Sequence, residues 1–112
     1  MLRFLKSLKF AMAGIAYGFK TQRHIRFHLF AGLIAITAGY IKGLDKTEWA
    51  ILICLIGAIV AAEFLNTAIE TVVDLVSPEY HPLAKAAKDT AAATVLILAM
   101  VAVVIGILLF AF

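Results

Sequence analysis

The chain has 112 residues, of which 64% are hydrophobic and only 15% are charged. Soluble domains are about half apolar and about a quarter charged, so this composition excludes an ordinary soluble protein and predicts an integral membrane protein. The length suits a single domain and excludes a large cavity enclosed by one chain. We therefore expect a site on the surface or between subunits of an oligomer.

The formal net charge of +3 favours contact with anionic lipid headgroups. No basic patch with interleaved aromatic residues is present, so we expect no nucleic-acid partner. The single cysteine, Cys54, lies in an apolar run and has no intrachain disulfide partner.

The first twenty residues carry Arg3, Lys6 and Lys9 at three-residue steps among leucine and phenylalanine. This pattern predicts an amphipathic helix over about 1–20 that lies on the membrane surface. A signal peptide would have an uncharged core, so we expect no cleavage.

The first predicted transmembrane helix covers about 25–41, near the lower limit of about 17 residues for a span. The sequence Lys42-Gly43-Leu44-Asp45 ends it. Asp45 and Glu48 have the spacing of a capping box at the start of the next helix. Trp49 is typical of the membrane interface, where its ring contacts lipid.

Two longer helices follow. The second is predicted over about 49–76 and, at about 1.5 Å per residue, is long enough to cross the hydrocarbon and project beyond it. The proline-containing loop from Ser77 to Pro82 ends this helix and starts the third, predicted over about 82–112.

The basic residues predict the topology. Six Lys and Arg in the N-terminal region join Lys85 and Lys88 of the second loop on one side, against Lys42 and Lys46 on the other. The positive-inside rule places the N-terminus and the second loop of this multi-pass membrane protein in the cytoplasm.

The second helix carries four polar residues on one face: Glu63, Asn66, Glu70 and Asp74 fall within roughly 80° on a helical wheel. Ionisable residues in a membrane helix are costly and usually functional. The residues alone leave three interpretations open: a polar seam between packed helices, a proton-coupled exporter, or phosphoryl transfer at the membrane surface. In the last, Glu63 is the base and Glu70 helps to hold a divalent cation. No Walker or kinase glycine loop is present.

Three segments together resemble the prokaryotic diacylglycerol kinase and undecaprenol kinase family. They are Glu63-x-Leu65-Asn66-Thr67-Ala68-Ile69-Glu70-x-x-Val73-Asp74, Glu79-Tyr80-His81 and Ala87-Lys88-Asp89. The resemblance extends over nearly the whole chain. It implies an all-α protein of the bacterial inner membrane that works as a homotrimer, with active sites between subunits and Mg²⁺ with ATP as phosphate donor. It also suits Trp49 as a contact for the lipid substrate.

The resemblance also implies roles for individual residues. Glu63 corresponds to the general base that activates the lipid hydroxyl, Asn66 lies beside it, and Glu70 is a magnesium ligand. Asp74 suits a structural or Lys-pairing role as well as a ligand contact, and Lys88 with Asp89 also suits an interfacial ion pair. The positions expected around the nucleotide are Arg3, Phe10, Gln22, Glu70, Glu79, Tyr80, His81, Lys88 and Asp89.

One position departs from the family pattern. Gln22 stands where a second metal-binding glutamate is usual, and a neutral amide lacks the charge that favours a hard cation. The segment around Ser77 to Lys85 is more similar to Gram-positive members. The resemblance therefore implies a lipid kinase with undecaprenol as the first expected substrate and diacylglycerol as the alternative.

Overall fold

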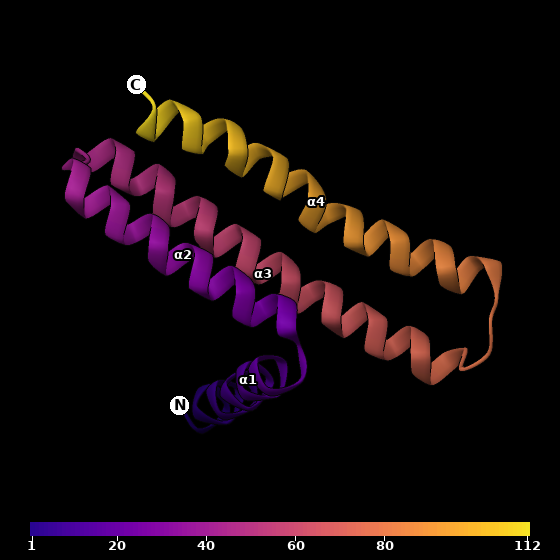
Figure 1. Cartoon of the computed structure of the whole chain (residues 1–112). Helices are drawn as coiled ribbons and strands as arrows, with labels where there is room; N and C mark the ends of the chain where they lie inside the picture. The colour runs from indigo at the N-terminus through magenta and orange to yellow at the C-terminus, as the bar shows by residue number, and fades with distance from the viewer.

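The computed structural model describes all 112 residues, as four α-helices joined by short connections. Helix α1 covers Leu2–Thr21, α2 Arg23–Lys42, α3 Lys46–Val76 and α4 Pro82–Phe110. Helices α2, α3 and α4 lie side by side, while α1 turns away at the start of α2 (Figure 1). These three helices are long and apolar enough to cross a membrane, so the prediction of an all-helical protein with three spans is confirmed.

A single extended residue, Gln22, joins α1 to α2, with φ −114° and ψ 111°. Arg26, one turn into α2, reaches back across this junction. Its Nη1 donates to the carbonyl oxygens of Phe19 at 2.6 Å and Lys20 at 3.1 Å. Carbonyls in the last turn of a helix have no partner within the helix, so Arg26 stabilises the end of α1 and fixes its direction relative to α2.

The turn between α2 and α3 follows local sequence rules. Gly43 adopts a left-handed conformation with φ +79°, which a residue without a Cβ tolerates. The predicted capping box is confirmed: the Glu48 amide donates to Asp45 Oδ1 at 2.9 Å, and the Asp45 amide donates to Glu48 Oε1 at 3.1 Å. Helix α3 therefore begins directly after Asp45.

The predicted proline loop also ends one helix and begins the next. Pro82 is the first residue of α4, where a missing amide hydrogen costs nothing. The His81 Nδ1 accepts from the Leu83 amide at 3.1 Å and caps this helix. Within the loop, Ser77 Oγ donates to the Glu79 carbonyl at 2.9 Å.

Only 11 of the 112 residues are buried, which is too few for a soluble domain. The small core lies at the end of the bundle where α2 turns into α3. It joins Leu44, Leu52 and Leu109, with Trp49 packed against them, and the Lys42 Nζ donates to the Leu109 carbonyl in the same place. The outer faces of the spans expose large apolar side chains, as a lipid environment requires.

Candidate active site

Glu63 is the most deeply placed charged residue of the chain. Only 6% of the residue is exposed, and its neighbours along the helix are mostly apolar. Its carboxylate faces α2, where the Nε2 atom of His28 lies 3.1 Å from Glu63 Oε1. His28 is itself largely covered, with 17% of its side chain exposed. The two helices thus bring a carboxylate and an imidazole together at membrane depth.

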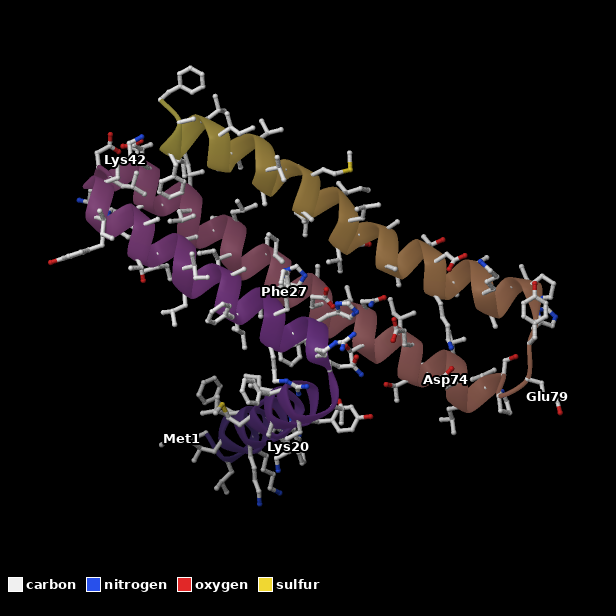
Figure 2. All side chains as sticks on the ribbon, viewed as in Figure 1. Met1, Lys20, Phe27, Lys42, Asp74 and Glu79 are labelled. Atoms are coloured by element: carbon white, nitrogen blue, oxygen red, sulfur yellow. The ribbon has the colours of Figure 1, made fainter.

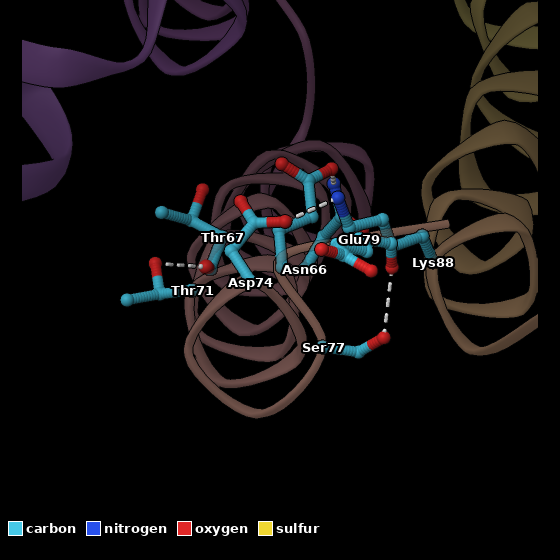
Figure 3. A network of polar contacts seen from close by, with 8 residues as sticks. Asn66, Thr67, Thr71, Asp74, Ser77, Glu79 and Lys88 are labelled. Atoms are coloured by element: carbon cyan, nitrogen blue, oxygen red, sulfur yellow. Dashed lines mark hydrogen bonds and ion pairs between the residues drawn. The ribbon is translucent and has the colours of Figure 1, made fainter. Parts of the chain in front are cut away.

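One turn further along α3, Asn66 and Glu70 form a second polar pair. The Asn66 Nδ2 donates to Glu70 Oε1 at 3.0 Å (Figure 3). The other end of the same amide, Asn66 Oδ1, is buried and has no hydrogen-bond partner. A buried acceptor without a partner costs free energy, so this oxygen is ready to accept a hydrogen bond from a ligand.

The last turns of α3 interact with the first turns of α4 through charges. Lys88 of α4 pairs with Asp74 of α3 (Figure 3). Asp89 pairs with Lys85 one turn earlier on its own helix. An ion pair between Lys88 and Asp89 is therefore wrong: neighbours in a helix point about 100° apart, and each side chain finds a better-placed partner. Asp74 takes the Lys-pairing role.

A polar hollow of about 360 Å³ lies where α3 ends and α4 begins. Five of the residues expected around a nucleotide line it, together with Asp74 and Lys85: Glu79, Tyr80, His81, Lys88 and Asp89. Figure 2 shows Asp74 and Glu79 at this end of the bundle and Lys42 at the other. The hollow therefore gathers cationic, aromatic and carboxylate groups from the second loop, as the positions in sequence predict.

Some of the residues expected at the site lie away from the polar hollow. Arg3 and Phe10 lie on α1 with exposed side chains, and Gln22 lies at the junction of α1 and α2. Trp49 is fourteen residues before Glu63 on α3, about 21 Å along the helix axis. Within one chain, Trp49 packs in the core near the α2–α3 turn and is separate from the polar residues.

Helix α1 approaches α3 beside Glu63. Gly18 lies so close to Phe64 that a Cβ at this position would be 2.4 Å from Phe64 Cε1. Next to this contact Thr67 is buried, and its Oγ1 donates to the Glu63 carbonyl at 2.9 Å. Its hydroxyl is satisfied by the helix itself, so Thr67 fills space at the contact.

The chain supplies carboxylate oxygens, the kind of ligand that magnesium prefers, although not as a complete set in one place. No group of three His, Cys, Asp or Glu side chains lies close enough to hold an ion in one chain. Glu70 accepts from Asn66 through one oxygen, which leaves its Oε2 available. Magnesium ordinarily takes one or two protein carboxylates plus phosphate oxygens and water. Glu70 therefore suits an ion that arrives bound to a nucleotide.

From the sequence alone, His28 is expected to be a satisfied interfacial histidine, and the structure shows Glu63 as its partner. His28 is the last charged or histidine side chain before Lys42 in the first span, and that isolation in an apolar run is the signal that the sequence offers. What could not be read from the sequence is its partner, because the contact depends on how α2 sits against α3.

The fold and these pairs define a small multi-span membrane protein with a series of paired carboxylates along α3, from Glu63 to Asp74. The family model described as prokaryotic diacylglycerol kinase matches residues 9–110. The chain belongs to this family and is a lipid kinase. Membership implies ATP as the phosphate source and favours kinase chemistry over the exporter and the polar seam that the residues alone left open.

Three relatives illustrate the similarity. An undecaprenol kinase of Bacillus subtilis is 44% identical over 96% of this chain and 88% of its own length. A diacylglycerol kinase of Synechocystis sp. is 46% identical over 91% of this chain and 59% of the relative. A diacylglycerol kinase of Haemophilus influenzae is 36% identical over 95% of this chain and 91% of the relative.

Proposed function

We propose that this lipid kinase transfers the γ-phosphoryl group of ATP to the hydroxyl of undecaprenol, with Glu63 as the general base. The observation that carries the proposal is the buried Glu63 carboxylate on an apolar helix long enough to span a membrane, where the hydroxyl of a membrane lipid can approach it. The similarity to an undecaprenol kinase over most of both chains supports the choice of acceptor.

The acceptor hydroxyl has two partners on α3 in this proposal. Its single proton is taken by the Glu63 carboxylate, while the hydrogen of Asn66 Nδ2 that is not given to Glu70 would donate to the hydroxyl oxygen and orient it before transfer. The hydroxyl oxygen then forms a bond to the γ-phosphorus as the bond from that phosphorus to the β-bridging oxygen breaks. The products are the lipid phosphate and ADP, and the proton remains on Glu63 until it is released to solvent.

The polar hollow at the start of α4 is the proposed site of the nucleotide. Lys88 would neutralise charge on the phosphates, and the loop residues Glu79, Tyr80 and His81 would contact the rest of the nucleotide. Bound Mg²⁺ would neutralise developing charge between the phosphates, held by Glu70 and, more weakly, by the neutral Gln22. Asp89 completes the hollow through its pair with Lys85.

A second subunit completes the site in this proposal. Arg3 and Phe10 on α1 are exposed in one chain and do not line the polar hollow. This separation favours a site that a neighbouring subunit completes. The homotrimer is what the family resemblance implies. The basic α1 would lie on the inner membrane surface, with the N-terminus and second loop in the cytoplasm.

Diacylglycerol is the alternative acceptor, favoured by the similarity to the Synechocystis and Haemophilus diacylglycerol kinases. The test is phosphorylation in mixed micelles by purified protein given Mg-ATP and either undecaprenol or diacylglycerol. We expect faster product formation with undecaprenol and loss of activity in E63Q. A higher rate with diacylglycerol would overturn the acceptor, and full activity of E63Q would overturn the base.

The matched control for this test is E48Q. It makes the same change of charge on the same helix, but Glu48 belongs to the capping box at the other end of α3. The side-chain oxygen of a glutamine still accepts a hydrogen bond from the Asp45 amide, so E48Q should keep wild-type activity. Chemical cross-linking in the same micelles tests the trimer, and a chain that is fully active as a monomer would contradict shared sites.

A further inference from the structure

We propose that His28 is a positioning residue that holds the Glu63 carboxylate in the orientation needed to receive the acceptor proton. The proposal rests on the proposed function of Glu63. The contact itself is direct, since His28 Nε2 lies 3.1 Å from Glu63 Oε1. With Oε1 engaged by the imidazole, Oε2 is the oxygen left for the substrate hydroxyl.

Glu63 has no other side-chain partner. The hydrogen bonds made near it go through its backbone carbonyl, which accepts from Thr67 Oγ1. With 8% of its side chain exposed, the carboxylate also has little water to fix it. A carboxylate with several rotatable bonds would sample several directions, so one neighbouring imidazole largely decides where its oxygens point.

His28 is itself held in place. The ring of Phe27 lies edge-on to the imidazole, with centroids 5.4 Å apart and planes at 78°. On its other side His28 lines an apolar cavity of about 150 Å³ between α2, α3 and α4, together with small residues such as Ala31, Gly32 and Ala102. His28 is therefore a polar side chain among apolar residues, with Glu63 as its polar partner, and polar groups inside membrane segments are usually functional.

During transfer the proton moves from the acceptor hydroxyl to Glu63 Oε2, the hydroxyl oxygen bonds to phosphorus, and ADP departs with the bridging oxygen. His28 neither receives this proton nor touches the substrate. Its effect is on the fraction of molecules in which Glu63 points correctly. A misplaced catalytic group lowers the rate of the chemical step and leaves nucleotide affinity unchanged, because the nucleotide residues lie further along α3 and on α4.

The test compares H28L, H28Q and H28N with wild type in the micelle assay. H28L should lower kcat by roughly 10- to 100-fold with the KM for ATP unchanged. H28Q carries an amide nitrogen about as far from the backbone as Nε2 and should restore kcat to within about threefold of wild type. H28N is one methylene shorter, cannot reach Glu63, and should resemble H28L. The control H24L, one turn earlier and exposed, should behave as wild type.

Each kinetic result either supports or overturns the positioning role of His28. Full kcat in H28L, an H28Q rate as low as that of H28L, or a change confined to the KM for ATP overturns the proposal. If H28L does not fold, H28Q and H28N, which are both polar, decide by the same difference. An inactive wild type, or a fully active E63Q, would instead overturn the proposed function, and so the two failures are distinguishable.

Discussion

Gly18 fixes how closely α1 approaches α3, and its replacement tests whether this distance matters. A Cβ at position 18 would lie 2.4 Å from Phe64 Cε1 and 3.0 Å from Ile25 Cδ1. Carbon atoms in good contact are about 3.5–4.0 Å apart, so Gly18→Ala forces a movement of about 1 Å. Ile25 is completely buried and also lies close to the added methyl group, so we expect α1 itself to move outward.

The expected free-energy cost of Gly18→Ala is the difference between two opposing contributions. Overpacking costs about 1–3 kcal/mol. Replacing glycine by alanine in a helix returns about 1 kcal/mol. The net cost of up to about 2 kcal/mol falls on the contact between α1 and α3. Since α1 carries Arg3 and Phe10, we expect the KM for ATP to rise by up to about thirtyfold.

Gly14 is the matched control, because it lies one turn earlier on the same helix and a Cβ there meets nothing within 4 Å. Gly14→Ala should leave the KM for ATP unchanged. A second substitution, Phe64→Leu, should restore most of the affinity lost in Gly18→Ala by making room. The measurements are initial rates against ATP concentration in micelles. Equal KM values for the two alanine variants, or no recovery with Phe64→Leu, would refute the reasoning.

Three further predictions concern other parts of the chain. Asp45→Ala removes the cap of α3 and should lower the free energy of unfolding by about 1 kcal/mol in thermal melts, whereas Asp45→Asn should keep most of it; equal losses would contradict the capping role. Lys88→Met should raise the KM for ATP about tenfold with little change in melting temperature, because its pair with Asp74 is exposed. A smaller rise than in Asp74→Asn would count against Lys88 as the phosphate partner. Gln22→Glu should lower the magnesium concentration for half-maximal rate, and an unchanged magnesium dependence would exclude a ligand at this position.

The features that the sequence predicted correctly depend on neighbours in the chain. Span length follows from apolar runs, and the Asp45–Glu48 capping box and the helix start at Pro82 depend on residues within four positions. Such patterns are local, and no tertiary contact competes strongly with them. The polar face of α3 was predictable for the same reason, since helical periodicity alone puts its four residues on one side.

The features that the sequence did not predict are contacts between helices. Lys88 has an acidic neighbour in Asp89 but pairs with Asp74, fourteen positions earlier, because the loop folds α4 back against α3. His28 meets Glu63 only because α2 has a particular rotation and depth against α3. Neither quantity is encoded in spacing along one helix. Periodicity indicates which face is polar, but not which residue on another helix faces it.

The scarcity of buried residues has a consequence for how stability is measured. With 11 of 112 residues buried, the chain gains little free energy from its own interior. The surrounding amphiphile, and the neighbouring chains of the proposed trimer, would act as ligands of the folded state, and mass action would then set its apparent stability. A melting temperature for this protein should therefore shift with protein concentration and with acyl-chain length of the detergent. The melting temperature therefore describes the mixture of protein and detergent, not the polypeptide alone.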